Sequence, residues 1–169
     1  MEILIPGLIL VALMVYVSTR IKKAAASAYD EELIETDEFA IAKPDGFIIP
    51  ADDESPFAFA AYSKEFGIGD ADEIRQVSAE LTIYENEAVE EIRESIFENE
   101  VKLISEQRLV GNALLLETES TFSGTAIGTE HRIIEKSGKV FHLAVSALAD
   151  NKEKQQSNID TFLTSFEVK

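Results

Sequence analysis

The segment FAIAKPDGF, residues 39–47, combines a strand pattern with a turn signal. FAIAK repeats with a period of two, which is the spacing of side chains on one face of a β-strand. The proline, aspartate and glycine that follow are residue types that favour a turn. We therefore expect an α+β globular domain over residues 39–169 that begins with a β-strand.

Strand-like segments recur along the rest of this region. Each is about as long as a strand and is bounded by turn residues. They cover residues 57–66, 77–85, 101–110, 112–121, 128–136 and 139–148. Ser137-Gly138 joins the last two as a short hairpin turn. Their spacing indicates an antiparallel meander.

Two segments have helical periodicity instead. In residues 87–98, Val89, Ile92 and Ile96 fall on one face of a helix, with charged residues largely opposite. The C-terminal segment opens with polar helix formers and directs four apolar side chains toward the core: Ile159, Phe162, Leu163 and Phe166. Its end, SFEV, is expected to be a short strand. The expected fold is an antiparallel β-sheet meander with helices packed on one face.

An uncharged apolar run, ILIPGLILVALMVYVST, occupies residues 3–19. As a helix it would be about 25 Å long, just short of a hydrocarbon core of about 30 Å. Three basic side chains follow it and can reach the interface: Arg20, Lys22 and Lys23. We expect residues 1–23 to form a single N-terminal transmembrane helix with a basic flank, in contact with the lipid bilayer through residues 3–19.

This run has two other interpretations, a cleaved signal peptide and a buried core helix. Ala26-Ser27-Ala28 is similar to a signal-peptidase site, but a signal peptide carries its positive charge before the apolar run. A buried core helix would be apolar along one stripe, whereas residues 3–17 are apolar all round. The anchor is the preferred interpretation.

The basic flank also predicts an orientation, because lysine and arginine mark the cytoplasmic end of a transmembrane helix. The expected location is the inner (plasma) membrane with the domain in the cytoplasm, and a periplasmic domain is the alternative. Residues 24–38 combine helix formers with an acidic run. They are expected to extend the helix to about Leu33 as a solvated acidic stalk; a docking strip for a basic partner is the alternative role.

The charge of the chain argues against two classes of partner. Acidic residues outnumber basic ones 32 to 15, for a net charge of −17. Such a surface repels phosphate backbones and anionic headgroups, so we expect no nucleic acid and no binding of the domain to an anionic lipid surface. The absence of cysteine excludes a disulfide framework, a thiolate nucleophile and a zinc–thiolate site.

The sequence shows no catalytic constellation. His131 and His142 are the only histidines, and neither has the spacing of a metal site. His131 follows Glu130 and is expected at the surface. The acidic loops at 52–54 and 70–73 lack the frame of a calcium-binding loop. We therefore expect no enzyme activity, no cofactor and no metal.

Several of these motifs resemble the PsbP/Mog1-like fold family. The first strand and turn of that family are matched here by Phe39, Ile41, Pro44, Gly46 and Phe47. Its closing Ser-Phe-x-Val is matched by residues 165–168. The family usually has tryptophan where Phe47 stands, and this chain has no tryptophan. The resemblance spans residues 39–168 and implies a non-enzymatic role, since relatives bind or stabilise larger protein assemblies.

These features favour a membrane-anchored, non-enzymatic accessory or interaction protein, such as a small subunit or stabilising factor of a larger membrane protein complex. Phe47 or Phe57, if exposed, would form an aromatic docking site. The alternative is a binding module for a small apolar ligand, with a cavity lined by residues such as Phe59, Leu81 and Phe141. An unrecognised hydrolase would require a serine or threonine hydroxyl within reach of a histidine.

Overall fold

The computed structural model describes residues 14, 16, 27–51, 55–99 and 101–169. The strands are β1 (Glu32–Glu35), β2 (Phe39–Lys43), β3 (Phe47–Ile48), β4 (Phe59–Ser63), β5 (Val77–Glu85), β6 (Lys102–Leu109), β7 (Ala113–Phe122), β8 (Thr125–Lys136), β9 (Lys139–Leu148) and β10 (Glu167–Val168). The helices are α2 (Val89–Ile96) and α3 (Lys152–Ser165), with short 3-10 turns η1 (Gly69–Ala71), η2 (Phe97–Asn99) and η3 (Ala149–Asn151).

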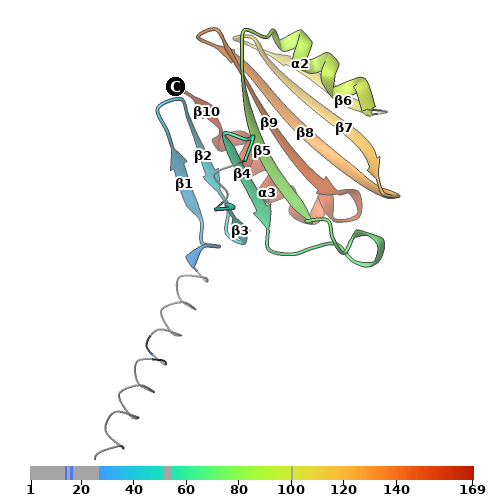
Figure 1. Cartoon of the computed structure of the whole chain (residues 1–169). Helices are drawn as coiled ribbons and strands as arrows, with labels where there is room; N and C mark the ends of the chain where they lie inside the picture. The colour runs from blue at the N-terminus through green and yellow to red at the C-terminus, as the bar shows by residue number, and fades with distance from the viewer. Residues whose placement is uncertain (1–13, 15, 17–26, 52–54, 100) are drawn as a thin grey trace, which may run out of the picture.

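The main sheet has seven strands in the order β3-β4-β5-β9-β8-β7-β6, and a smaller sheet has the order β1-β2-β10 (Figure 1). All pairings are antiparallel, which confirms the expected meander. The observed strand β5 has the same bounds as the strand predicted at residues 77–85. Ser137 and Gly138 form the β8–β9 turn with φ angles of 56° and 77°, as a tight hairpin of this kind requires.

The two helices lie on opposite faces of the main sheet, so the prediction that they pack on one face is wrong. Figure 1 shows α2 in front of the sheet and α3 behind it. On β9, Val140 packs in the cluster under α2, whereas the next residue, Phe141, packs in the cluster that contains Phe162 of α3. Successive strand residues point to opposite faces, so each helix has its own apolar floor.

The larger core lies beneath α3. Phe162 contacts Phe47 edge-on, with 5.1 Å between ring centroids, and Phe59 at 6.3 Å. Ile159 and Phe166 complete the buried stripe of the helix, and both have no exposed surface. Three of the four predicted core positions are thus buried, whereas Leu163 is half-buried at the edge of this core; Phe47 belongs to the same core.

The predicted helical stalk to Leu33 is wrong, because residues 32–35 form β1. This strand pairs antiparallel with β2, from Glu32 opposite Lys43 to Glu35 opposite Ala40. Cross-strand pairing with β2 overrides the local helix propensity of the acidic run. The folded unit therefore begins before residue 39.

A buried lysine fixes the start of this unit. Only 2% of Lys43 is exposed. Its ammonium group donates hydrogen bonds to the backbone carbonyls of Ala28, Asp30 and Phe47. The three acceptors join the segment before β1 to the start of β3, so the incoming chain is attached directly to the core.

The predicted anchor at 3–19 and its flank, Arg20, Lys22 and Lys23, lie outside the described residues, apart from Met14 and Tyr16. Within the ranges given above, no helix has the length and apolarity needed to cross a bilayer.

Candidate functional site: a groove beside helix α3

The face of the sheet that carries α3 is only partly covered by this helix. Apolar positions of β5 and β9 lie under α3, whereas the corresponding positions on β6, β7 and β8 border an open groove of about 540 Å³. Its apolar lining comes from Leu109, Leu115 and Leu163. Its charged lining comes from Glu117, Glu130, Arg132 and Asp160. An apolar floor with a few polar groups is typical of a binding groove.

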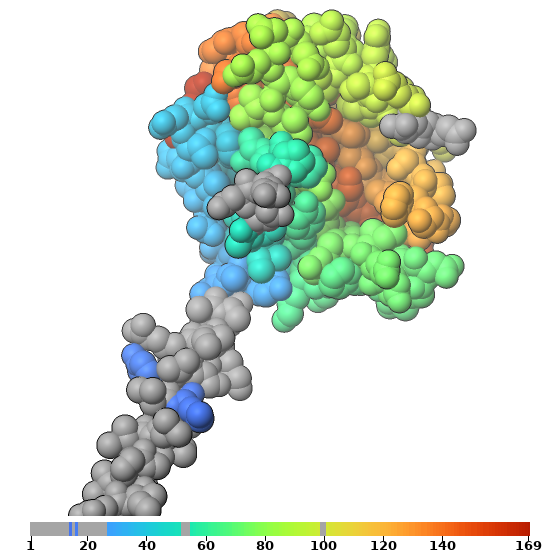
Figure 2. Space-filling model, in the orientation of Figure 1, coloured from blue at the N-terminus to red at the C-terminus, as the bar shows by residue number. Residues whose placement is uncertain are grey.

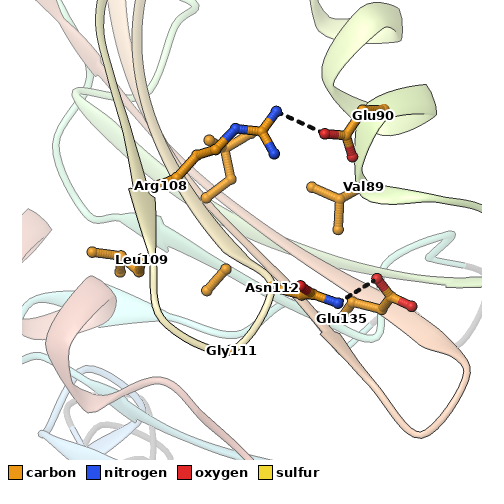
Figure 3. A pocket seen from close by; sticks show the side chains of 9 residues that line it. Val89, Glu90, Arg108, Leu109, Gly111, Asn112 and Glu135 are labelled. Carbon is orange, nitrogen blue, oxygen red and sulfur yellow. Dashed lines mark hydrogen bonds and ion pairs between the residues drawn. The ribbon is translucent and has the colours of Figure 1, made fainter.

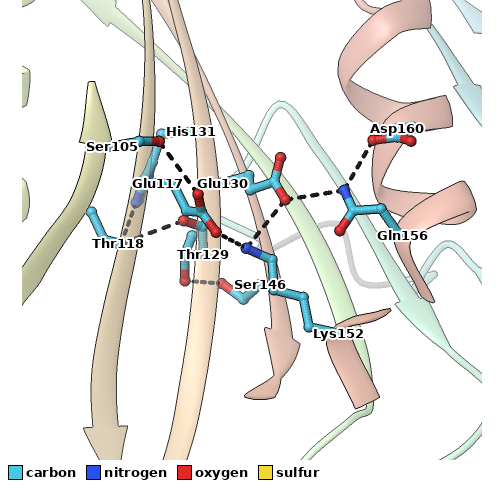
Figure 4. Close-up of polar contacts among 10 residues, drawn as sticks. All are labelled: Ser105, Glu117, Thr118, Thr129, Glu130, His131, Ser146, Lys152, Gln156 and Asp160. Atoms are coloured by element: carbon cyan, nitrogen blue, oxygen red, sulfur yellow. Dashed lines mark hydrogen bonds and ion pairs between the residues drawn. The ribbon is translucent and has the colours of Figure 1, made fainter. Parts of the chain in front are cut away.

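A network of ion pairs forms one wall of this groove (Figure 4). Lys152, at the start of α3, contacts Glu117 on β7 at 2.5 Å and Glu130 on β8 at 3.2 Å. Gln156, one turn further along α3, donates hydrogen bonds to Glu130 and Asp160. The network attaches the helix to strands that its apolar stripe does not reach.

The same network shifts the protonation equilibria of its members. The hydrogen bond from Lys152 lowers the pKa of Glu117, although burial opposes this. Burial alone would lower the pKa of Lys152, but its hydrogen bonds and charge contacts with Glu117 and Glu130 raise it overall. The ion pair therefore stays charged at neutral pH.

Arg132 lines the groove and has one buried donor that no described residue pairs. Its guanidinium group donates to the backbone carbonyl of Leu163 and lies over the ring of Phe166, 5.9 Å from the centroid. Burial lowers the pKa of Arg132, and the nearby charge of Glu167 opposes this. Its Nε is buried and has no hydrogen-bond partner among the described residues. A buried donor without an acceptor is costly, but this nitrogen has almost no exposed surface, so a molecule in the groove cannot reach it unless neighbouring atoms move.

Strand β6 borders the groove and has a free edge. It is the last strand of the main sheet and pairs only with β7 in the described part of the chain. Seven of its eight residues are exposed, and the pairing is irregular between Leu103 and Ser105. An edge strand presents unpaired backbone groups that can bind an additional extended segment.

A second groove, of about 360 Å³, lies between α2 and the β6–β7 turn (Figure 3). Arg108 and Glu90 form an ion pair of 2.7 Å across it, and Asn112 donates to Glu135 at 3.4 Å. Both members of the ion pair are more than half exposed, so water competes for these contacts. The groove has no buried unpaired polar group comparable to Arg132 among its lining residues.

The two histidines lie side by side on the opposite face of β8 and β9. His131 Nδ1 is 2.9 Å from His142 Nε2, and His131 Nε2 is 3.0 Å from the hydroxyl of Thr118. The expectation of a surface position for His131 is wrong, because 7% of it is exposed. Glu130 is half-buried toward α3, and the next residue points to the other side of the sheet.

The contact between Thr118 and His131 places a hydroxyl within hydrogen-bonding distance of an imidazole, as a hydrolase would require. Burial lowers the pKa of His131 to about 3, and His142 adds to this effect. Burial also lowers the pKa of His142 to about 4. A general base is most effective when its pKa lies near the working pH, and Thr118 is only 3% exposed. The geometry of this trio therefore suits a buried hydrogen-bond network better than a substrate site.

The predicted aromatic docking site is not assembled by the structure. Phe47 is 2% exposed and packs on Phe162, so it has no surface for a partner. Phe57 is half-buried. The residues proposed to line a ligand cavity, Phe59, Leu81 and Phe141, are at most 5% exposed and border none of the grooves described here.

The α3 groove was not anticipated, although its strands carry a sequence signal. Glu117 and Glu130 are directly opposite each other on β7 and β8, and Leu115 is opposite Arg132. A strand face covered by a helix is expected to be apolar throughout. Charged residues at these positions therefore mark the part of the face that the helix leaves open.

Comparison with known proteins identifies structures with a similar fold, all at low sequence identity. No protein-family model and no curated protein sequence matches the chain. A cyanobacterial PsbP from Synechocystis is similar, with a TM-score of 0.59 at 13% identity over 83% of this chain and 94% of that one.

Two further solved structures are similar over nearly the same region. The Ran-binding protein Mog1p of Saccharomyces cerevisiae has a TM-score of 0.55 at 10% identity, over 83% of this chain and 96% of that one. LpqN of Mycobacterium tuberculosis, involved in cell envelope biogenesis, has a TM-score of 0.51 at 14% identity, over 82% and 90%. The expected PsbP/Mog1-like fold is thereby confirmed.

Proposed function

We propose that this chain, a PsbP/Mog1-like domain, is a membrane-anchored accessory protein that binds a membrane protein complex through the α3 groove. The apolar run at 3–19 would hold it in the inner membrane, with the domain in the cytoplasm. The fold hosts many functions, so the proposal rests on the groove and on the N-terminal run rather than on the fold.

The observation that carries the proposal is an open groove with an apolar floor beside the free edge of β6. An extended segment of a partner protein would add to β6 through backbone hydrogen bonds. Apolar side chains of the segment would cover Leu109 and Leu115.

Charge favours a basic partner segment. Glu117, Glu130 and Asp160 lie along the groove, and only Lys152 and Arg132 offset them there. The chain as a whole carries a net charge of −17, so a basic segment would also be attracted from a distance. Positively charged segments next to transmembrane helices are common on the cytoplasmic side. A membrane protein with such a segment is therefore the expected partner.

The first test is affinity purification of the tagged full-length chain in mild detergent, with mass spectrometry of the proteins that accompany it. A single stoichiometric membrane complex would support the proposal and identify the process. A chain that is recovered alone would contradict constitutive membership of a complex.

A pair of variants locates the binding surface. Leu115→Arg places a bulky charge on the floor of the groove, whereas Val110→Arg places the same side chain on a fully exposed turn outside it. Loss of the complex with Leu115→Arg but not with Val110→Arg supports the groove, provided that both variants retain the thermal stability of the parent. Equal recovery of the complex would mean that another surface binds.

Orientation is tested separately by a reporter fused after Lys169. Activity of a cytoplasmic reporter is expected. Activity of a periplasmic reporter would overturn the proposed orientation and leave the groove proposal intact.

A further inference from the structure

The chain arrives at one defined end of the main sheet, called here the proximal end. This proximal end comprises the segment 27–31, the β4–β5 connection 64–76, the β7–β8 turn and η3. The backbone N–H of Gly46 donates to the carbonyl of Tyr29, and that of Lys64 donates to Gly46. Figure 2 shows the β4–β5 connection (green) beside the first described residues of the domain (blue). The incoming segment is thus attached to the β4–β5 connection itself.

Large apolar side chains are exposed at this end. The exposed fraction is 90% for Ile68 and 62% for Phe122, and Phe66 between β4 and η1 is 43% exposed. Ile68 and the β7–β8 turn flank a groove of about 490 Å³ that also includes Ala126 and Leu148. Isolated exposed apolar residues are ordinary, but several on neighbouring loop tips at one end indicate a contact surface.

The β4–β5 connection is packed so that Ile68 must point outward. A Cβ added at Gly67 would lie 2.6 Å from the Ala71 side chain and 2.7 Å from that of Leu148, so only glycine permits this approach. The N–H of Gly67 donates to the carbonyl of Ile74 at 2.9 Å. The Gln76 side chain donates to the carbonyl of Phe66 at 3.0 Å. The exposure of Ile68 therefore belongs to a well-packed loop.

The opposite, distal end of the sheet differs in composition. It carries the β1–β2, β6–β7 and β8–β9 turns, and ion pairs join Lys139 to Glu38 and Glu85 there. Val110, which is fully exposed on the β6–β7 turn, provides a matched apolar position far along the strands from Ile68.

We infer that the proximal end contacts the bilayer surface through Ile68 and Phe122, which fixes the domain upright on the membrane. This inference rests on the proposed anchor. Eight residue steps separate Thr19, the end of the apolar run, from Ser27. They span about 12 Å as a helix and at most about 28 Å when extended, so the proximal end stays close to the membrane. Tethering at this distance makes even weak apolar contacts effective, because the local concentration of lipid is high.

The contact is expected to be stronger with zwitterionic than with anionic lipid. Asp70 and Asp150 line the groove between the two tips, and its described lining includes no basic residue, although Arg75 lies over the ring of Phe66 nearby. Anionic headgroups would repel these carboxylates. Apolar side chains at such a surface enter the boundary between headgroups and acyl chains, about 5–10 Å deep.

The absence of cysteine allows a direct test in the full-length chain. Ile68→Cys, Phe122→Cys and Val110→Cys are labelled singly with an environment-sensitive fluorophore. Each protein is reconstituted into phosphatidylcholine nanodiscs that contain lipids with a nitroxide quencher near the headgroup. We expect emission at shorter wavelength and several-fold stronger quenching at positions 68 and 122 than at 110. Quenching at 68 should fall when anionic lipid replaces part of the phosphatidylcholine.

The outcomes separate this inference from the proposed anchor. Chains that do not remain with the nanodiscs would refute the anchor and the inference together. Chains that remain with the nanodiscs but show equal quenching at all three positions would refute the inference alone. Stronger quenching at 110 would mean that the distal end faces the membrane. Unchanged thermal unfolding of the labelled proteins excludes loss of fold as the cause.

Discussion

Helix α3 and the strands beneath it form two regions on one face of the same sheet. Over β5 and β9, the helix buries Ile159, Phe162 and Phe166 in a packed aromatic and aliphatic core. Over β7 and β8, it is held by Lys152 and Gln156 and leaves a groove open. The first region supplies stability through buried apolar area, and the second supplies the polar groups that the proposed partner would contact. Substitutions in the two regions should therefore have different effects.

The largest effect is expected in the packed region. Phe162→Ala removes the ring that contacts Phe47 and Phe59, and should lower the free energy of unfolding by about 3–5 kcal/mol. Leu115→Ala, in the half-buried floor of the groove, should cost less than about 2 kcal/mol. Urea unfolding measures both. Equal losses would remove the distinction between the two regions.

A buried charge tests whether the packed region tolerates polar groups. Lys43→Met keeps the length of the side chain but leaves the carbonyls of Ala28, Asp30 and Phe47 without this donor. A loss of about 2–4 kcal/mol in the free energy of unfolding is expected. Lys64→Met, at an exposed lysine, is the control and should change it by less than about 0.5 kcal/mol. A neutral result for Lys43→Met would mean that water replaces the ammonium group.

The histidine pair on the reverse side of β8 predicts a pH dependence. The folded-state pKa values, about 3 for His131 and about 4 for His142, lie below the usual 6.5. The unfolded chain therefore binds more protons as the pH falls below 6.5, and between pH 7 and pH 5 each histidine lowers the free energy of unfolding by about 2 kcal/mol. Above pH 6.5 their contribution is complete.

The acidic residues act in the opposite direction, because lowering the pH reduces the net charge of −17 and its self-repulsion. The comparison with a His131→Gln/His142→Gln double variant isolates the histidine contribution. Thermal unfolding from pH 7 to pH 5 should destabilise the parent relative to the double variant. Parallel curves for the two proteins would contradict the low pKa values.

The smallest effect is expected from the ion pairs of the groove. Lys152→Met should lower the free energy of unfolding by about 1 kcal/mol or less, since Glu117 remains partly exposed. The part of the salt dependence of stability that comes from this ion pair should disappear, because screening no longer has that pair to weaken. Lys154→Met, on the exposed side of α3, provides the control. A loss as large as that of Phe162→Ala would show that the ion pairs, rather than the core, hold the helix.

Local patterns were sufficient to predict most elements. The period-two alternation of apolar residues correctly predicted β5, and the turn residues Ser137-Gly138 correctly predicted the β8–β9 hairpin. Both signals are properties of short stretches of sequence. The apolar spacing in residues 151–168 gave α3 and its buried residues. These signals do not depend on which other segment packs against them.

The errors concern contacts between distant segments. The periodicity of α2 defines its apolar face but not which side of the sheet that face covers. Residues 32–35 favour a helix locally, and only pairing with β2 makes them a strand. The groove and the position of His131 depend on where α3 ends relative to β7 and β8, which no single stretch of sequence specifies. Tertiary context overrides local propensity in each case.

The small sheet has a mechanical consequence. Both β1 and β10 flank β2, and they run in the same direction. The N-terminal segment leaves β1 at the proximal end, while Lys169 leaves β10 at the distal end and donates to Glu38 there. If the N-terminal segment is anchored as proposed, tension between the anchor and the C-terminus would pull β1 and β10 in opposite directions along β2. Their hydrogen bonds would be loaded in shear, all together, rather than unzipped one after another.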